Sequence, residues 1–252
     1  MTFELTPNTI FVFLLILTRL GTMLMLLPAI GESMMPARTR LAVGFGMAFI
    51  LFPLVEGQYP DVPVGLTALI VMLGGEIMVG LFVGGTARLV MSTLQYAGAI
   101  IAFQIGLAFA QNYDPTQGVQ AALLGSFLSV LGVTLVFAMD LHHLMIMAMH
   151  DSFELFRPGH LIPIDTAVDL VVDIIAGSFV VSLQLSAPFI IFGLVFYIGL
   201  GVLSKLMPQV QVFFVAMPAN IALGLALFFL MLSVMMFWFA EYFVEATSVF
   251  LV

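Results

Sequence analysis

The sequence predicts an all-α integral membrane protein built of helical hairpins, with long antiparallel helices in its C-terminal part. Of its 252 residues, 63% are hydrophobic and 8% are charged, whereas about a quarter of the residues in an ordinary soluble domain are charged. Several apolar runs also reach the length of about 20 residues that a helix needs to cross a bilayer. Lipid or partner proteins must therefore cover much of the surface.

The first apolar run extends from Ile10 to Ile30 and is interrupted only by Arg19. It ends in a turn-rich stretch over residues 31–40, and a shorter second run follows from Leu41 to Val55. Residues 1–8 contain Glu4 and no basic residue, so the basic start of a cleavable signal peptide is missing. We expect the first run to remain in the mature protein.

The middle of the chain is apolar from Val64 to Tyr113. This stretch is too long for one span, which suggests a helical hairpin folded near Arg88. Asp114 to Gln120 combines Asp-Pro with a following glycine, which is typical of a loop. We expect one further helix from Ala121 to His150.

Two longer apolar stretches follow a linker at residues 151–165, one from Thr166 to Lys205 and one from Gln211 to Thr247. Each would be about 55–60 Å long as an unbroken helix, against about 30 Å for the hydrocarbon core. They could kink at their prolines, or project beyond the bilayer and pack against other subunits. We favour projection, with residues 207–209 as the hairpin tip.

Basic residues predict the topology, because they favour the cytoplasmic side. Arg38 and Arg40 place the first loop in the cytoplasm, and Lys205 places the last hairpin tip there. Both termini are then expected outside.

Composition and motifs argue against catalysis and cofactors. A net charge of −8 with six scattered basic residues excludes a nucleic-acid partner. The absence of cysteine removes thiol chemistry and Cys-ligated metal. The sequence has no HExxH, GxSxG, GxGxxG or Walker motif. We expect no enzyme activity, no cofactor and no metal.

Ionisable residues inside apolar runs are candidates for function, since each costs about 2.5–3.5 kcal/mol on insertion scales. One interpretation is that these residues form a proton relay. The other is that they lie at helix ends or at contacts between proteins. We favour the second, because the acids and histidines lie in separate segments. The residues are Arg19, Glu76, Arg88, Asp140, His142 and His143.

Neither the histidines nor the acidic stripe predicts a metal site. His142 and His143 are adjacent, so on a helix they point about 100° apart and cannot easily share a metal. Asp165, Asp169 and Asp173 fall on one helical stripe, which is more typical of a solvated face.

Gly80 and Gly84 form a GxxxG pattern within the middle apolar stretch. Small residues at this spacing let helix backbones approach closely in lipid. The segment is therefore expected to pack tightly against another helix.

Several stretches, taken in chain order, resemble the FliR family, the flagellar members of the type III secretion export-gate proteins. The matching residues run from position 19 to about 219. They are Arg19-Leu-Gly21, Leu27-Pro28, Gly31 and Pro36-Ala-Arg38-Thr-Arg40; Gly75-Glu76, Gly80, Gly84 and Ala87-Arg88; Gln104-Ile-Gly106, Tyr113-Asp114-Pro115, Asp140-Leu-His142, Ser152-Phe153 and Pro158-Gly159; and Pro208-Gln209, Phe213-Phe214 and Met217-Pro218-Ala219.

This resemblance implies a non-enzymatic subunit of the flagellar export gate, in the bacterial inner membrane at the basal body. It implies assembly with FliP-type and FliQ-type subunits into a pore for unfolded flagellar proteins, in contact with membrane lipid and with FlhB-type and FlhA-type components. It also implies a FliP-like region over residues 1–165 and a FliQ-like hairpin over residues 166–252.

The resemblance further suggests three groups of site residues. A plug loop near residues 106–120 would close the pore, although the same stretch could be a plain helix connection. The plug candidates are Gln104, Gly106, Phe109, Asn112, Tyr113, Asp114, Pro115 and Gly118. The candidates for subunit packing are Arg19, Glu76, Gly80, Gly84 and Arg88. The candidates for the partner-facing tip are Lys205, Pro208, Gln209, Phe213 and Pro218.

Two other functions stay open at this point. Intramembrane Glu76 and Asp140 would suit a proton-coupled transporter of a small solute. An injectisome homologue of the same family would have the same chemistry. A transporter should show paired broken helices in two related halves, whereas an export-gate subunit should copurify with small membrane partners.

Overall fold

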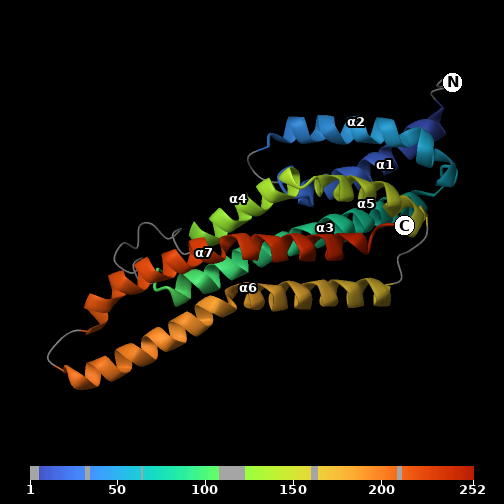
Figure 1. Ribbon diagram of the computed structural model, residues 1–252. Helices are drawn as coiled ribbons and strands as arrows, with labels where there is room; N and C mark the ends of the chain where they lie inside the picture. Colours follow the sequence, from blue (N-terminus) through green and yellow to red (C-terminus); the bar gives the residue numbers. More distant parts are fainter. Residues whose placement is uncertain (1–5, 32–34, 64, 108–122, 160–163, 209–211) are drawn as a thin grey trace. The chain divides into compact units, whose positions relative to one another are not determined.

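The computed structural model describes residues 6–31, 35–63, 65–107, 123–159, 164–208 and 212–252, except the side chains of 164–166, 213 and 214. In these ranges the chain is all-α, with no strand, as the sequence predicts (Figure 1). The elements are α1 (Pro7–Leu26), α2 (Ala37–Val55), the 3-10 turn η1 (Glu56–Gln58), α3 (Leu66–Gln104), α4 (Leu123–Ala138), α5 (His142–Leu155), α6 (Ile164–Leu206) and α7 (Val212–Ser248).

Five of the described helices are long and apolar enough to cross a membrane, and α4 and α5 meet the same test as a broken pair. In the most apolar part of each of the five, 22% to 39% of the residues are buried inside the chain. The remaining apolar residues need lipid or protein around them, as expected of an integral membrane protein.

Helix α3 corrects the prediction of a hairpin near Arg88. The chain forms one helix of 39 residues from Leu66 to Gln104, about 58 Å long. Arg88 is exposed on its side, so the charge stays outside the packed interior without a break in the backbone. Neither Pro nor an Asn-Gly type turn interrupts the stretch, and paired glycines alone do not end a helix that packs along its length.

The single helix predicted over residues 121–150 is also wrong, because α4 ends at Ala138 and α5 begins at His142. Asp140 lies between them with φ of 59°, in the left-handed region. Asp and Asn are the non-glycine residues that adopt this conformation most readily, since their short polar side chains can bond locally. An α-helix cannot continue through such a residue.

The two long C-terminal helices agree with the prediction. Helix α6 has 43 residues and α7 has 37, which corresponds to about 64 Å and 55 Å. Of the predicted hairpin tip, Met207 and Pro208 are exposed, and Gln209 lies outside the described residues. Both helices thus exceed the thickness of a hydrocarbon core.

The chain forms two compact units, each assembled from separate segments. Unit 1 comprises residues 1–90, 137–175 and 243–252. Unit 2 comprises residues 91–136 and 176–242. These units differ from the predicted division at residue 165, which concerns likeness to other subunits and stays a prediction.

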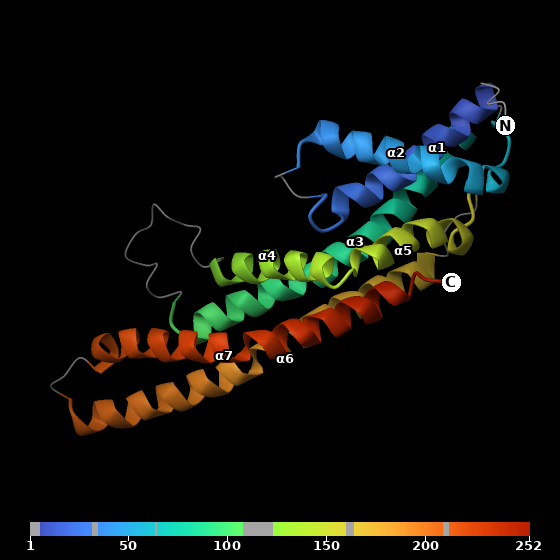
Figure 2. The same ribbon diagram turned by 45° about the horizontal axis from the view of Figure 1, so that its top comes forward.

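In unit 1, α1 pairs antiparallel with α2 and lies beside it in both ribbon views (Figures 1 and 2). The Phe13 ring contacts the Phe52 ring, with centroids 6.2 Å apart, while Leu24 at the other end of α1 lies against Gly44. The same α1 runs parallel to the start of α3, where a Cβ on Gly84 would lie 2.9 Å from the Met23 carbonyl oxygen. Glycine is needed at this contact.

In unit 2, the end of α3 lies antiparallel to α4 and parallel to α6. Gly98 of α3 faces Gly125 of α4 backbone to backbone. On the α6 side, the Ser182 hydroxyl donates to the Thr93 carbonyl at 3.1 Å, and the Ser186 hydroxyl donates to the Ala97 carbonyl at 3.3 Å. Small residues at both contacts allow the close approach that helices use in lipid.

Candidate functional site

Arg19 is the centre of a buried polar cluster in unit 1. It lies on α1 within an otherwise apolar face, is 1% exposed, and forms an ion pair through Nε with the Glu76 carboxylate of α3. Its guanidinium also donates to the Ser152 carbonyl at 2.9 Å and to the Phe156 carbonyl at 3.1 Å. The guanidinium carbon lies 4.4 Å from the centre of the Phe153 ring. One planar cation therefore connects α1, α3 and the end of α5.

The carbonyls that Arg19 binds lie at the C-terminal end of α5. The Ser152 carbonyl accepts the capping hydrogen bond of the Phe156 amide at 3.0 Å as well as the bond from Arg19, whereas the carbonyl of Phe156 itself lies past the last turn of the helix, where carbonyls lack helical partners. A cation there also complements the negative end of the helix dipole. Arginine suits the position because it offers five donors in a fixed fork, which one carboxylate and two carbonyls can share.

Tyr59 completes the cluster by donating its hydroxyl to Glu76 Oε2 at 3.3 Å. Burial, followed by the nearby Glu76 carboxylate, raises the pKa of the Tyr59 phenol well above its ordinary value. Tyr59 is therefore a neutral hydrogen-bond donor. With Arg19 and Tyr59 as its partners, Glu76 is engaged within the fold.

The proton-relay interpretation gains no support from this geometry. Glu76 contacts Arg19 and Tyr59, whereas Asp140 lies with His142 and His143 at the break between α4 and α5. Within the described residues, no hydrogen bond or ion pair joins the two groups.

The residues predicted to pack against other subunits fall into two classes in the described part of the chain. Gly80 lies against Thr22 and Gly84 against Met23, so both serve the α1–α3 contact, as Arg19 and Glu76 do. Arg88 is exposed on α3, and no ion pair to another described residue is present. Of the five, Arg88 is the residue best placed to meet a partner, and the subunit contacts stay a prediction.

The start of the predicted plug loop lies in unit 2, at the end of α3. Gly106 has φ of 80°, and its amide donates to the Phe103 carbonyl at 3.2 Å. This is the left-handed glycine that commonly ends a helix. Gln104 lies against Gly193 of α6, and Gly106 lies against the Asn220 amide of α7. The other plug candidates, Phe109, Asn112, Tyr113, Asp114, Pro115 and Gly118, lie outside the described residues.

The predicted partner-facing tip is exposed where it is described. Lys205, in the last turn of α6, Pro208 and Pro218 are all exposed. Gln209 lies outside the described residues, and so does the side chain of Phe213. An exposed, short tip between two long helices is compatible with a contact to another protein.

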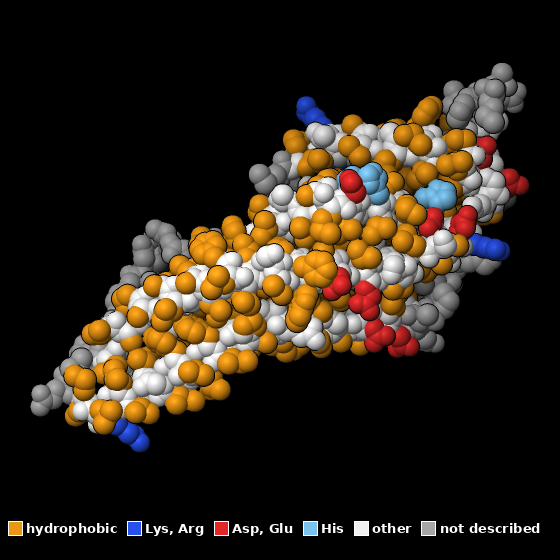
Figure 3. Space-filling model, viewed as in Figure 1, with side chains coloured by type: hydrophobic (Ala, Val, Ile, Leu, Met, Phe, Trp, Pro, Cys, Tyr) orange, Lys and Arg blue, Asp and Glu red, His pale blue; other side chains and the backbone are white. Residues whose placement is uncertain are grey.

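Asp169 and Asp173 of the acidic stripe in α6 are exposed, which agrees with the prediction of a solvated face, while the side chain of Asp165 lies outside the described residues. Apolar side chains dominate the rest of the view in Figure 3. Large apolar residues of α6 and α7 are exposed, among them Ile191, Leu194, Phe229 and Leu230. Each of these four side chains is more than 60% exposed.

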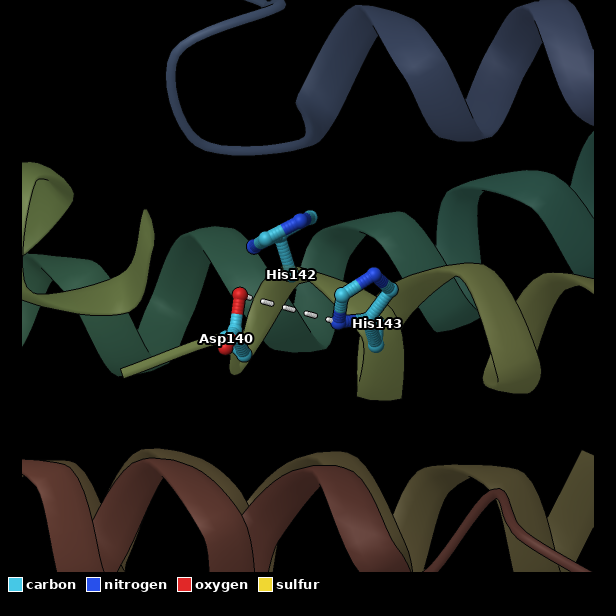
Figure 4. Close-up of side chains that lie close together, drawn as sticks. All are labelled: Asp140, His142 and His143. Carbon is cyan, nitrogen blue, oxygen red and sulfur yellow. Dashed lines mark ion pairs between the residues drawn. The ribbon is translucent and has the colours of Figure 1, made fainter. Parts of the chain in front are cut away.

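His142 and His143 do not point apart as the sequence predicts. Their ring centroids are 4.2 Å apart, and the ligand atoms of Asp140, His142 and His143 all lie within 4.8 Å of one another (Figure 4). The prediction considered only the 100° offset of adjacent helical residues. Both histidines lie in the first turn of α5, where their rings lie against each other, and the left-handed turn at Asp140 adds a carboxylate to the pair.

Several structural residues were missed by the sequence reasoning. Ser178, Ser182 and Ser186 recur every four residues in α6 and form its polar contacts to neighbouring helices. This spacing is the small-residue pattern that identified Gly80 and Gly84, so it could have been recognised. Asn220, which is 2% exposed, had no comparable signal.

Comparison with known proteins gives a consistent result. Residues 10–246 match the family of bacterial export proteins, family 1. The chain is 41% identical over 238 residues to the flagellar biosynthetic protein FliR of Caulobacter vibrioides, covering 94% of this chain and 95% of that one. It is 27% identical over 226 residues to FliR of Bacillus subtilis, covering 88% and 86% of the two chains. It is 24% identical over 224 residues to the Yop proteins translocation protein T of Yersinia pestis, covering 88% and 85%. The chain therefore belongs to the bacterial export proteins, family 1, and within them to the FliR family of flagellar biosynthetic proteins.

Proposed function

We propose that this chain is a non-enzymatic subunit of the flagellar type III protein export gate, located in the bacterial inner membrane at the basal body. The observation that carries the proposal is its 41% identity to a FliR protein across 95% of that protein's length. The lower identity of 24% to a Yop translocation protein favours the flagellar role over the injectisome role.

The chain acts in this proposal as one wall of a pore, assembled with FliP-type and FliQ-type subunits and in contact with FlhB-type and FlhA-type components. Two features of the described residues support a shared assembly. Helices α3, α6 and α7 are longer than a bilayer core requires, and large apolar side chains remain exposed along α6 and α7. Partner helices would cover these surfaces.

The test of the proposal is deletion of the gene in the source bacterium and restoration with the cloned chain. Deletion should abolish swimming and the release of hook and filament proteins into the medium, and the cloned chain should restore both. Normal release of these proteins from the deletion strain would contradict the flagellar role.

A second test separates the export gate from a lone transporter. The chain, tagged and extracted in mild detergent, should elute with several copies of small membrane proteins, and its complex mass should far exceed that of one chain. A stable monomer without partners would favour the transporter.

The loop after Gly106 is proposed to plug the pore between exported proteins. Support comes from its start, where a left-handed glycine ends α3 beside Asn220 of α7, and from the rule that irregular backbone at membrane depth must lie in protein or in a watery cavity. Deleting residues 106–117 should make cells that carry the assembled complex leak small solutes. Unchanged permeability would refute the plug.

A further inference from the structure

We propose that Asp140, His142 and His143 form a binding site for one divalent transition-metal ion, with Zn²⁺ as the expected occupant. The site lies within unit 1, at the break between α4 and α5 (Figure 4). It is independent of the export function proposed above.

The donor set is the first argument. Two imidazoles and one carboxylate are ligands that Zn²⁺ accepts, and three protein ligands with one open position are typical of accessible zinc sites. Their ligand atoms already lie within 4.8 Å of one another. Ligand atoms around tetrahedral zinc are about 3.4 Å apart, because each bond is about 2.0–2.2 Å long. Rotation of the exposed Asp140 and His143 side chains can close this difference.

The backbone is the second argument, because it creates the convergence. Asp140 adopts φ of 59°, and its carbonyl accepts a hydrogen bond from the His143 amide at 3.0 Å. This turn brings the Asp140 carboxylate to 3.9 Å from His143 Nδ1. In a continuous helix the three side chains would point in different directions.

The third argument is that the ligand groups are not engaged in hydrogen bonds to other described residues. The Asp140–His143 separation of 3.9 Å is too long for a hydrogen bond. Nδ1 of His142 is buried and has no hydrogen-bond partner among the described residues. The His142 ring is held by the Phe137 ring, stacked at 5.0 Å. A metal ion would give these groups a common partner.

The test is titration of the purified full chain, in detergent and with a histidine-free tag, with Zn²⁺ alone by calorimetry. Cobalt(II) alone provides a second readout, since tetrahedral imidazole and carboxylate ligation gives strong visible absorption. The wild type should bind one Zn²⁺ per chain. His143→Gln, which changes a side chain 65% exposed, should weaken binding at least tenfold and remove the cobalt absorption.

Asp140→Asn tests the carboxylate without disturbing the turn, because Asn also tolerates the left-handed region. It should weaken Zn²⁺ binding by a similar factor while elution volume and helical circular dichroism stay unchanged. The matched control is His150→Gln, because His150 already shares a 2.8 Å hydrogen bond with Asp151 outside the cluster. This control should bind Zn²⁺ as the wild type does.

Two outcomes would overturn the proposal. One is the absence of stoichiometric Zn²⁺ binding by the wild type. The other is wild-type affinity in both His143→Gln and Asp140→Asn, which would show adventitious binding elsewhere on the chain.

Discussion

At the scale of single residues, the chain uses one buried cation to organise a largely apolar unit. Arg19 is 1% exposed and Glu76 is 2% exposed, and each satisfies the other within the fold. The sequence identified both as unusual because charged residues in apolar runs are costly. It could not show that they pair, because 57 positions separate them and only the packing of α1 on α3 brings them together.

Arg19→Met should destabilise the chain by about 3–5 kcal/mol, because it leaves the Glu76 carboxylate buried without a counter-charge. The double variant Arg19→Met, Glu76→Leu should recover much of the loss, since it removes both charges. Thermal unfolding in detergent measures the stability of the single and the double variant. Arg38→Met, at an exposed position, is the control and should unfold as the wild type does. Equal losses in the single and double variants would contradict the pairing.

Tyr59 gives the chain a specific alkaline sensitivity. Its pKa is raised in the folded state, against about 10 in an unfolded chain. Above pH 10 the unfolded state therefore releases a proton that the folded state retains, so stability falls as pH rises. The free energy of unfolding of the wild type should fall by about 1.4 kcal/mol per pH unit above pH 10.

The measurement is thermal unfolding between pH 9 and pH 11 for the wild type and Tyr59→Phe. The variant should be less stable at pH 9, because it lacks the hydroxyl that donates to Glu76, but its stability should fall less steeply. Tyr96→Phe removes an exposed tyrosine and should keep the wild-type dependence. Parallel pH profiles for wild type and Tyr59→Phe would exclude this role.

At the scale of helices, small residues determine which faces touch. Gly98 and Gly125 join α3 to α4, and the serines of α6 bond to carbonyls of α3. The apolar runs predicted α6 and α7 well, because a long run in an apolar medium must satisfy its backbone hydrogen bonds internally, and a helix does so even with one proline inside it. The same runs gave a wrong hairpin near Arg88 and a wrong continuous helix through Asp140. Hydropathy does not report whether a charged residue lies on the side of a helix or in a break between two helices.

Gly98→Ala should destabilise the contact between α3 and α4 by about 1–3 kcal/mol, because the added methyl would overlap the backbone of Gly125. Gly85→Ala, on the same helix, meets no atom within 4 Å and should be neutral or stabilising by up to about 1 kcal/mol. Thermal unfolding of the two variants side by side measures the difference. Equal effects would show that Gly98 is not in a close contact.

At the scale of the whole molecule, the composition of the surface determines which environment the chain requires. Its charged fraction of 8% leaves few groups for water to solvate, and many large apolar side chains are exposed over α6 and α7. Such a chain needs lipid or protein around it. We expect the group that meets Arg88, exposed on the apolar helix α3, to be polar or anionic.

Arg88→Leu should leave the unfolding temperature of the lone chain nearly unchanged but reduce swimming and the amount of copurified partner subunits. Arg88→Lys should restore part of both, because it keeps the charge and loses the planar fork. Arg157→Leu, an exposed position after α5, is the control for loss of a positive charge. Undiminished copurification with Arg88→Leu would exclude Arg88 from the interface.

The amino-acid sequence alone was enough to predict an all-α membrane protein, two long helices formed by residues 166–205 and 211–247, and a resemblance to the FliR family. Those properties follow from composition, run length and motif order, which are local or additive along the chain. The tertiary structure decided that Arg19 pairs with Glu76, that α3 is continuous, and that Asp140 meets His142 and His143. These depend on backbone breaks and on contacts between distant segments, which pattern and hydropathy do not encode.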